Sequence, residues 1–585
     1  MRKIISGNEA IAIGAYRANA SFASGYPGTP SSEILEYTKT FEDIKVQWAS
    51  NEKSAFEQAL GSSIAGRRSF VTMKHVGLNV AADSLMSSSY TGINAGFVVV
   101  VADDPGMHSS QNEQDTRLFA KFAQVPILEP SDAKEAMGFM QYAFSLSEEY
   151  DTPVILRSTT RVSHTQELVY FDMHKLGGTE DKLLAKNISK YVLVPKNALL
   201  RHKKLLERNT KLQKLTNETP LNRIEQGSLN VGIITSGVSY LYAKELLPEA
   251  NFLKIGLSWP FPIDLAKEFT KNFEKVIVIE ELEPYIEEQL KIAGINNVEG
   301  KKFFPQDGEF NLDIVEEGLA KASVLEKRHK KYFEVPKNLP ERPPVLCPGC
   351  PHRPIFDILH SLKVYVTGDI GCYTLGAAPP LSSIHTTVCM GASISMGYGI
   401  AKASQNHKIV SVIGDSTFLH TGIQPLIDAY VNNVAYTVII LDNSITAMTG
   451  GQPDAVSGFN IKNEPAPKVD LENLVRSIGI KRVFKVDQYN YKKTKEIIEQ
   501  EINTKELSVI IATRPCVLAP IKIKETPYFV IADKCIDCKR CLRIGCPAIG
   551  YKESKAYIIE DLCTGCALCA EVCPTLAIVK GESNE

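Results

Sequence analysis

Two runs of closely spaced cysteines near the end of the chain constrain its folding more than any other feature. One run is Cys535-x2-Cys538-x2-Cys541-x4-Cys546-Pro547, and the other is Cys563-x2-Cys566-x2-Cys569-x3-Cys573-Pro574. Three cysteines at x2 spacing wrap the chain tightly around one centre, and the second run has the spacing typical of a bacterial-type [4Fe–4S] ligand run. The two runs therefore predict two iron–sulfur cubes in a short terminal domain.

In such paired runs the fourth cysteine of each run ligates the cube of the other run. One cube is then held by Cys535, Cys538, Cys541 and Cys573, and the other by Cys546, Cys563, Cys566 and Cys569. The x4 spacing before Cys546 departs from the pattern by one residue, so a three-iron cluster is the alternative there. A pair of structural zinc sites is disfavoured, because such sites usually pair two C-x2-C elements.

The composition is that of an ordinary globular protein, with 44% hydrophobic and 23% charged residues and a net charge of −2. It gives no reason to expect nucleic acid or an anionic membrane as partner. No apolar run reaches the roughly 18 residues of a membrane-spanning helix. The start, MRKIISGNEAIAIGAYRANA, is broken by Asn8, Glu9 and Arg17 and predicts an amphipathic helix, not a signal peptide. We expect a cytoplasmic location, where clustered cysteines hold metal more often than disulfides.

The rest of the chain has the pattern of an α/β protein. Apolar runs such as AGFVVVVADD alternate with helical patterns, which predicts βα units around mostly parallel sheets. Changes in pattern and composition suggest the following blocks: residues 1–190, a charged helical segment 191–228, residues 229–330, a proline-rich linker 331–345, residues 346–525 and the cysteine-dense residues 526–585. The charged helical segment is expected to be a solvated connecting helix.

Two predicted strands in block 346–525 end in residues suited to a divalent cation. Asp415, within Gly414-Asp415-Ser416, follows one apolar run, and Asn443 closes the next. The pair is similar to the thiamine-diphosphate motif, a GDG followed by an NN, here written as GDS and DN. Magnesium takes oxygen ligands in octahedral geometry and shares them with phosphate. Asp415 and Asn443 are therefore predicted to supply side-chain oxygens to the Mg2+ of a diphosphate.

A thiamine enzyme also needs a glutamate from another domain, which hydrogen-bonds the pyrimidine ring and promotes formation of the reactive carbanion. In NEKSAFEQALG, Glu52 opens a predicted helix and is our candidate for that residue. The alternative is a solvated glutamate favoured by the helix dipole.

Several motifs together resemble one known family. They are SGYPGTPSSEI (24–34), NEKSAFEQALG (51–61), MKHVGLNVAAD (73–83), DDPGMHSSQNEQDTR (103–117), CPGCPHRP (347–354), GDIGCYTLG (368–376), GDST, TAMTGGQ and the cysteine runs. The chain resembles the indolepyruvate ferredoxin oxidoreductase alpha subunits, within the thiamine-diphosphate-dependent 2-oxoacid:ferredoxin oxidoreductases. The resemblance implies a pyrimidine-binding domain, a transketolase C-terminal-like domain, a diphosphate-binding domain and a ferredoxin-like domain with two [4Fe–4S] clusters, in that order along the blocks above.

The resemblance also implies roles for individual residues. The backbone carbonyl of Ile445 would be the third protein ligand of Mg2+. The residues expected at thiamine diphosphate are Gly28, Glu52, Gly414, Asp415, Ser416, Asn443 and Thr446. Those expected near the substrate are Thr29, Arg117 and His75. Relatives often carry a third cluster, which here would use Cys347, Cys350, Cys372 and Cys516 and leave Cys389 over; buried structural cysteines are the alternative.

The implied activity is oxidative decarboxylation of arylpyruvates such as indolepyruvate with coenzyme A, with electrons passing through the clusters to ferredoxin. The resemblance implies a small beta subunit and an α2β2 heterotetramer. Three alternatives stay open: a ferredoxin oxidoreductase of another 2-oxoacid such as pyruvate or 2-oxoglutarate, a non-oxidative thiamine-dependent lyase, and a non-catalytic electron-transfer subunit. Cluster potentials, the coenzyme A site and the physiological direction are not readable from the residues.

Overall fold

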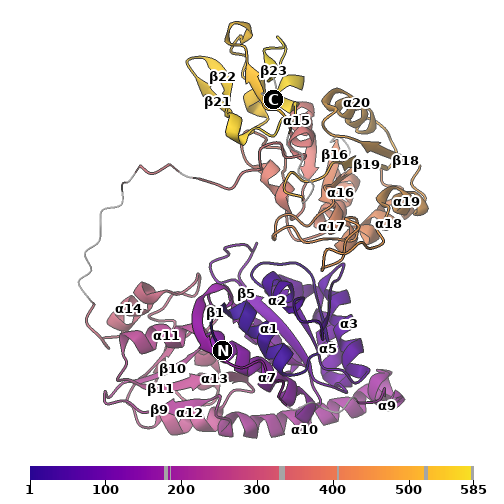
Figure 1. Cartoon of the computed structure of the whole chain (residues 1–585). Helices are drawn as coiled ribbons and strands as arrows, with labels where there is room; N and C mark the ends of the chain where they lie inside the picture. Colours follow the sequence, from indigo (N-terminus) through magenta and orange to yellow (C-terminus); the bar gives the residue numbers. More distant parts are fainter. Residues whose placement is uncertain are drawn as a thin grey trace. The chain divides into compact units, whose positions relative to one another are not determined.

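The structure is a computed structural model of the chain and describes residues 1–176, 182–184, 186–327, 336, 338–340, 342–404, 408–519 and 525–581 (Figure 1). The chain forms two compact units, residues 1–333 and residues 334–585. Each unit is described below by itself. Residues 331–335, 337 and 341 of the predicted linker 331–345 lie outside the described residues. In the described parts, no helix is both long and apolar enough to cross a membrane.

A seven-stranded sheet forms the centre of unit 1. Its strand order is β12 (Leu257–Trp259), β6 (Ile127–Leu128), β7 (Val154–Thr159), β5 (Phe97–Asp103), β4 (Ser69–Lys74), β2 (Phe22–Gly25) and β3 (Lys45–Trp48). All neighbours are parallel except β12, which runs antiparallel to β6. Strand β5 is buried along its whole length, as expected for a parallel strand covered on both faces.

Helices cover both faces of this sheet. Helices α3 (Glu52–Ile64), α5 (Ala82–Thr91) and α6 (Thr116–Ala123) pack on one face, and α1 (Gly7–Arg17) and α7 (Ala133–Tyr150) pack together on the other (Figure 1). The remaining elements of this part are β1 (Arg2–Ser6), α2 (Ser32–Thr38), α4 (His75–Val80), α8 (Thr160–His164), β8 (Gln166–Tyr170) and α9 (Ile188–Tyr191).

The start of the chain differs from its sequence-based prediction. Residues 2–6 form β1, which pairs antiparallel with β8, and the helix begins only at Gly7. Helix α1 is not amphipathic toward solvent, because residues 10–15 are all buried. Its contacts with both α2 and α7 leave no face for water, which the sequence pattern alone could not indicate.

A second, five-stranded sheet completes unit 1. Its order is β14 (Val298–Glu299), β13 (Val276–Ile279), β10 (Gly232–Ser236), β11 (Asn251–Ile255) and β9 (Arg223–Glu225), with only β9 antiparallel to its neighbour. Its helices are α11 (Gly237–Leu246), α12 (Ile263–Thr270), α13 (Tyr285–Ile292) and α14 (Leu312–Lys321). Strand β12 follows β11 in the chain but pairs with β6 of the first sheet, so it connects the two sheets of unit 1.

The charged segment forms helix α10 (Pro195–Glu218), which contacts both α5 and α12 (Figure 1). It is not solvated all round, because Arg201, Leu205, Arg208, Leu212 and Thr216 are buried along one face. Arg208 donates to the carbonyl oxygen of Ser89 at 3.0 Å, and Arg201 pairs with Asp151 at 2.9 Å. Helix α10 therefore packs against unit 1 along one face and also connects its two sheet regions.

Unit 2 contains a five-stranded, wholly parallel sheet. Its order is β15 (Tyr365–Thr367), β16 (Ile409–Gly414), β17 (Thr437–Asp442), β19 (Ser508–Thr513) and β18 (Arg482–Val486). Helices α15 (Arg353–Leu362) and α20 (Tyr491–Glu501) pack on one face, and α16 (Ala392–Ala403), α18 (Ile423–Val431) and α19 (Leu471–Ser477) on the other. This doubly wound arrangement places ligand sites at the carboxyl ends of the strands.

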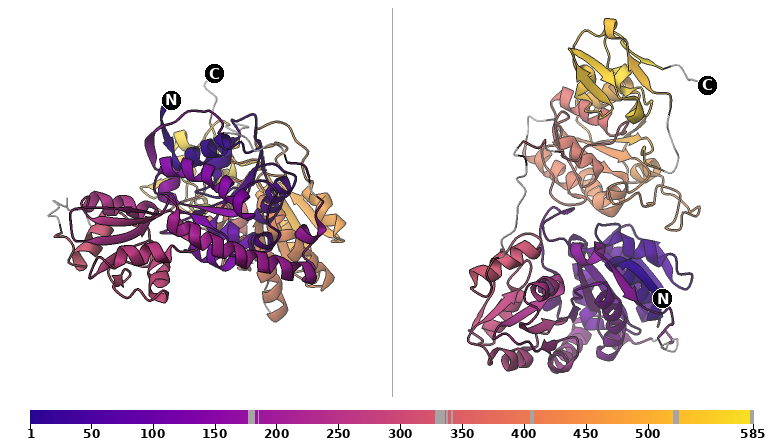
Figure 2. Two further views of the ribbon diagram at one scale, coloured as in Figure 1. Left: turned by 90° about the horizontal axis from the view of Figure 1, so that it is seen from below. Right: turned by 60° about the vertical axis from the view of Figure 1, so that its left-hand side comes forward.

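The end of the chain forms a small cysteine-rich lobe of unit 2 (Figure 2, right, in yellow). It consists of two antiparallel pairs, β20 (Tyr528–Val530) with β23 (Ile578–Lys580) and β21 (Ile549–Lys552) with β22 (Lys555–Ile558). Two one-turn helices, α21 (Arg540–Arg543) and α22 (Leu568–Glu571), each carry the third cysteine of a run. The predicted α/β class with a small ferredoxin-like end is confirmed; the predicted domain boundaries stay predictions.

Candidate functional site

Asp415 and Asn443 come together at the carboxyl ends of neighbouring strands. The parallel register of β16 and β17 sets Gly414 beside Leu441, so the residues that follow both strands meet at one edge of the sheet. Asp415 Oδ2 accepts hydrogen bonds from the backbone N–H groups of Asn443 and Ser444, at 3.0 and 2.8 Å. The two residues predicted to hold a magnesium ion therefore form one buried corner.

This corner is acidic. Burial raises the pKa of Asp415 well above its usual range, and the neighbouring Asp454 and Asp442 raise it further. Burial, together with Asp442, also raises the pKa of Asp454 to about 6, and Asp454 Oδ2 is buried with no partner among the described residues. Carboxylates that repel one another in a buried place are relieved by a bound cation. The residues present therefore fit a divalent ion; Asp454 was missed from the sequence, where it stands in a loop without a motif.

The other predicted diphosphate residues lie in the same corner. Thr446 Oγ1 donates to Ser416 Oγ at 3.1 Å, which joins the loops after β16 and β17. The backbone N–H of Ile445 donates to Asn443 Oδ1 at 3.3 Å. A Cβ at Gly414 would lie 2.6 Å from the ring of Tyr373, so a glycine is required where this ring closes on the strand end.

Next to this corner lies a first set of four cysteines, Cys347, Cys350, Cys372 and Cys516, here called the inner group. The backbone N–H of Cys516 donates to the carbonyl oxygen of Asn443 at 3.1 Å. Burial, then Cys347 and Cys516, raises the pKa of the Cys350 thiol to about 12, and burial with Cys516 and Cys347 raises that of Cys372 to about 11. Cys347 and Cys516 thus neighbour each other and each of the other two thiols, and the charged forms of the four would be relieved by bound iron.

His352 sits between the inner group and Asn443. Its side chain does not cap helix α15, although it precedes that helix. Its Nε2 atom lies 3.5 Å from Asn443 Nδ2, and burial lowers its pKa to about 4, so the ring is neutral.

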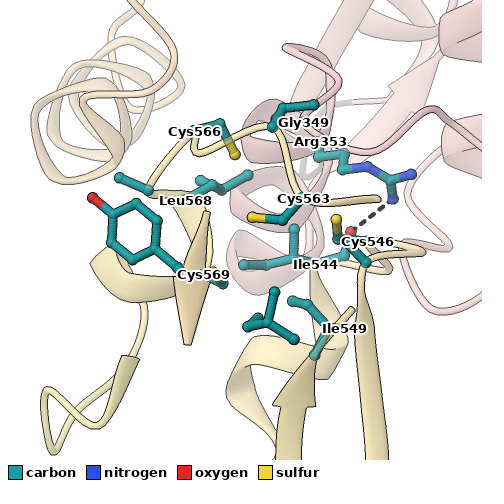
Figure 3. Close-up of a pocket in the computed structure, with 14 residues that line it drawn as sticks. Gly349, Arg353, Ile544, Cys546, Ile549, Cys563, Cys566, Leu568 and Cys569 are labelled. Atoms are coloured by element: carbon teal, nitrogen blue, oxygen red, sulfur yellow. Dashed lines mark hydrogen bonds between the residues drawn. The ribbon is translucent and has the colours of Figure 1, made fainter. Parts of the chain in front are cut away.

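A second set of four cysteines, Cys546, Cys563, Cys566 and Cys569, lines a hollow in the terminal lobe and is here called the middle group. The rest of the lining is mainly apolar and includes Ile544, Ile549 and Leu568; Gly349 and Arg353 reach it from the other part of unit 2 (Figure 3). The sulfurs of Cys546, Cys563 and Cys566 are seen around this hollow in Figure 3. Cys546, whose x4 spacing was irregular, lies with the other three.

A third set, Cys535, Cys538, Cys541 and Cys573, lines a separate hollow and is here called the outer group. The Cys573 sulfur accepts a hydrogen bond from the backbone N–H of Ala577 at 3.3 Å. Burial, then the other middle-group thiols and Cys541, raises the pKa of Cys569 to about 12, so the middle and outer groups adjoin. No described cysteine forms a disulfide.

In unit 1, Glu52 opens helix α3 and is buried. A Cβ at Gly77 would lie 2.7 Å from Glu52 Oε1, so a glycine on α4 is what leaves room for this carboxylate. Lys74 at the end of β4 is a neighbour that the sequence analysis missed. Its Nζ donates to the carbonyl oxygen of Ser109 at 2.8 Å; burial lowers its pKa, against the pull of Asp104 and Glu52. Its only signal in the sequence is its position at a strand end.

Three further predicted residues lie around the ends of β2 and β4. A Cβ at Gly28 would lie 3.2 Å from Lys74 Cδ, so Gly28 accommodates the lysine stem. Thr29 is half-buried, and its carbonyl oxygen accepts from Ser109 Oγ at 3.1 Å. His75 is buried; its Nε2 lies 3.1 Å from the carbonyl oxygen of Asn112, and its Nδ1 has no partner among the described residues.

Arg117, predicted to lie near the substrate, is buried in a network of ion pairs and hydrogen bonds. Its guanidinium is 1% exposed and pairs with Asp115 at 2.5 Å and with Glu280 at 2.7 Å. Its Nη2 also donates to the carbonyl oxygens of Glu281 and Glu283, at 2.9 and 3.2 Å. With all three nitrogens engaged and no access to solvent, Arg117 ties the first sheet of unit 1 to the second, and its place near a substrate stays a prediction.

Three protein-family models match parts of the chain. Residues 13–220 match the family described as pyruvate flavodoxin/ferredoxin oxidoreductase, thiamine diP-binding. Residues 369–512 match the thiamine pyrophosphate enzyme, C-terminal TPP-binding domain, and residues 556–579 match the 4Fe-4S binding domain. Together these matches define the class of thiamine-dependent, iron–sulfur-containing oxidoreductases.

Curated relatives narrow the class. The indolepyruvate oxidoreductase subunit IorA of Archaeoglobus fulgidus is 39% identical, with 99% of this chain and 97% of the relative covered. The subunit IorA of Pyrococcus abyssi is 40% identical, with 100% of this chain and 98% of the relative covered. A solved 2-oxoglutarate:ferredoxin oxidoreductase from Magnetococcus marinus aligns at 20% identity and a TM-score of 0.44, over 51% of this chain and 62% of its own. The chain belongs to the family of the indolepyruvate oxidoreductase subunit IorA and is an oxidoreductase.

Proposed function

We propose that this chain is the catalytic subunit of an enzyme that oxidatively decarboxylates arylpyruvates, indolepyruvate among them, with coenzyme A. The products are the aryl-acetyl-CoA thioester, CO2, one proton and two electrons, and the electrons leave one at a time for ferredoxin. The assignment of an arylpyruvate as substrate is supported by the names of the full-length relatives. The assignment of coenzyme A as acyl acceptor is supported by the family resemblance of the motifs.

One observation carries the proposal most directly. The acidic corner at Asp415 and the inner cysteine group share a hydrogen bond between Cys516 and Asn443. The inner group is followed by the middle and outer groups. A cofactor that yields electrons would thus sit at the start of a row of redox centres, an arrangement that a non-oxidative lyase has no use for.

Thiamine diphosphate, when bound, supplies a carbanion that adds to the ketone carbon and accepts the electron pair left by CO2. Asp415, Asn443 and the carbonyl of Ile445 would hold its Mg2+, with Gly414, Ser416 and Thr446 beside the diphosphate. Glu52 would hold the proton exchanged with the pyrimidine ring. Glu52 belongs to unit 1 and Asp415 to unit 2, and the family resemblance implies a role for each in binding thiamine diphosphate.

We propose a [4Fe–4S] cluster on each of the inner, middle and outer groups. The middle and outer thiols surround hollows. Thiols around a hollow suit a cube better than zinc, whose sulfurs would all lie about 2.3 Å from one centre.

For the assembly, we propose a small beta subunit in an α2β2 heterotetramer, with soluble ferredoxin as electron acceptor. Full-length relatives are named as subunits, which supports a partner chain. A 2-oxoglutarate synthase subunit KorA of Archaeoglobus fulgidus, 26% identical over 52% of this chain, keeps other 2-oxoacids as the second candidate substrates.

The test is reduction of ferredoxin by the purified complex in the presence of coenzyme A and one acid at a time: indolepyruvate, phenylpyruvate, hydroxyphenylpyruvate, pyruvate or 2-oxoglutarate. The proposal expects the highest kcat/KM with an aryl acid and a thioester product. Preference for pyruvate or 2-oxoglutarate would replace the substrate class. Release of aldehyde without ferredoxin reduction would indicate a lyase, and a complex loaded with iron but free of thiamine would indicate an electron-transfer subunit.

A further inference from the structure

Arg353 is a buried cation between two of the cysteine groups. It begins helix α15, three residues after Cys350, and only 2% of it is exposed. Its Nε donates to the carbonyl oxygen of Cys347 at 3.1 Å. Its Nη1 donates across to the terminal lobe, to the carbonyl oxygen of Ile544 at 3.1 Å (Figure 3) and to that of Gly545 at 2.6 Å.

The charge of this guanidinium has no carboxylate partner among the described residues. Its hydrogen bonds all go to carbonyl oxygens, the fourth acceptor being Leu346. The charged neighbours that act on it are thiols of both groups: Cys546 and Cys566 of the middle group, and Cys350 and Cys347 of the inner group. A guanidinium keeps its proton in proteins, and an uncompensated buried charge costs several kcal/mol. The compensating negative charge must therefore come from the sulfur ligands of the two groups.

The backbone around Arg353 holds the two groups close together. A Cβ at Gly349, in the loop of Cys347 and Cys350, would lie 2.1 Å from Thr564 Oγ1, in the loop of Cys563 and Cys566. The Tyr489 hydroxyl donates to the carbonyl oxygen of Gly349, and the phenol also neighbours Cys566 and Cys350.

Gly545 also contributes to the close contact between the inner and middle groups. It has φ +69°, and a Cβ there would lie 3.3 Å from Arg353 Nη1. A residue with a side chain would press on the guanidinium and adopt a strained backbone. The two loops therefore meet with the guanidinium enclosed between them.

We propose that Arg353 is the shared counter-charge of the inner and middle iron–sulfur clusters, and that it raises the reduction potential of both. One electron leaves the inner cluster, which is oxidised, and reduces the middle cluster. Because the guanidinium stays charged throughout, no proton accompanies the electron. A fixed positive charge buried between the two groups favours the reduced, more negative state of each cluster. Net charge and hydrogen bonding are known determinants of cluster reduction potentials. Arg353 is thus a positioning and electrostatic residue for electron flow.

The test compares Arg353→Gln with Arg353→Lys in the complete complex. Glutamine keeps donors for the backbone carbonyls but loses the charge, whereas lysine keeps the charge. Each variant is titrated with a chemical reductant and followed by EPR, with iron and thiamine content measured beside it. Arg543→Met is the matched control, because Arg543 is an arginine of the same lobe that is 50% exposed and whose charge is screened by water.

In Arg353→Gln, the reduction potentials of the inner and middle clusters should fall, so that both clusters are harder to reduce. The expected fall is about 59 mV or more for each one-electron couple, which is about tenfold in the equilibrium constant for reduction. The outer cluster, Arg353→Lys and Arg543→Met should stay near wild type. Unchanged potentials in Arg353→Gln, or equal shifts in the Gln and Lys variants, would overturn the proposal. Loss of iron in both variants would also overturn it, by making Arg353 a structural tie only. The proposal needs the clusters of the proposed function but not its substrate, since the titration contains no 2-oxoacid.

Discussion

The backbone N–H of Cys516 donates a hydrogen bond of 3.1 Å to the carbonyl oxygen of Asn443. Asn443 follows strand β17 and takes part in the acidic corner with Asp415, whereas Cys516 follows β19, the next strand of the same sheet. Two loops from adjacent parallel strands thus bring a candidate cofactor ligand and a candidate cluster ligand into contact. Electron transfer between bound groups depends on such proximity, so this pair of residues is where the proposed function is most open to test.

Replacing Cys516 by serine should remove or convert the inner cluster and leave the other two in place. If all three groups bind cubes, iron should fall from about twelve toward about eight atoms per chain. Thiamine should still bind, because the carbonyl of Asn443 is not removed, and ferredoxin reduction by the 2-oxoacid should fall strongly. Iron analysis and EPR of the reduced protein measure the change. Cys389→Ser is the control: Cys389 is exposed and should lose no iron. Wild-type protein with about eight iron atoms would rule out the inner cluster.

Replacing Glu52 by glutamine should slow the reaction by roughly 100- to 10,000-fold, the range usual for loss of a general acid–base group. Gln keeps the volume and an acceptor oxygen but cannot exchange the proton, and it should fit beside Gly77 as the carboxylate does. Substrate-dependent ferredoxin reduction measures the effect, and iron and thiamine contents should be unchanged. Glu57→Gln on the same helix, whose side chain is exposed and pairs with Lys53, is the matched control. Equal activity in the two variants would refute the role of Glu52.

The acidic corner predicts a pH dependence of the thiamine-free protein. Asp454 has its pKa raised from 3.8 to about 6, and the pKa of Asp415 is raised in the same direction. A folded-state pKa above the unfolded value gives stability that is complete below about pH 4 and is lost as pH rises through about 6. Without magnesium and thiamine diphosphate, the unfolding temperature should therefore be lower at pH 7 than at pH 5.

Adding Mg2+ with thiamine diphosphate should reverse this trend, because the cation binds the ionised carboxylates and its affinity then rises with pH. The measurement is a thermal unfolding series at both pH values, with and without the cofactor. Asp454→Asn should reduce the pH dependence, whereas Asp428→Asn, on an exposed part of α18, should not. A thiamine-free protein that is more stable at pH 7 than at pH 5 would contradict the assignment of these pKa shifts.

Local spacing carried much of what could be predicted at this site. The cysteine runs predicted two crossed sets of four, and the structure brings each of those sets around one hollow. Asp415 and Asn443 could be paired from the sequence because residues that follow adjacent parallel strands meet at one sheet edge. In both cases a short-range sequence pattern, either ligand spacing or the position of strand ends, indicates which residues come together.

Contacts between distant segments could not be predicted in this way. Arg353 bonds the carbonyl of Ile544, 191 residues away, and Arg117 bonds Glu280, 163 residues away. In the sequence, each is one arginine within a motif, and nothing in that motif indicates its distant partner. Asp454 likewise lies in a loop with no periodicity, and only the folded chain sets it next to Asp442 and Asp415. Strand β12 was missed for the same reason, since it leaves the second sheet region of unit 1 to pair with β6.

Replacing Arg117 by methionine should destabilise unit 1 by about 3–5 kcal/mol, the cost of breaking a buried ion pair by removing one partner. Asp115 and Glu280 would be left buried without their cation, and both lie within hydrogen-bonding distance of Arg117. The same change would have a different signature if Arg117 bound the substrate carboxylate, because KM would then rise while the unfolding temperature stayed constant. Thermal unfolding and KM of one preparation separate the two roles. Arg161→Met is the control, since Arg161 is 44% exposed in its pair with Glu309, and such surface pairs contribute about 0–1 kcal/mol. A lower unfolding temperature for the Arg117 variant alone, with KM nearly unchanged among the molecules that remain folded, is the result that the buried network requires.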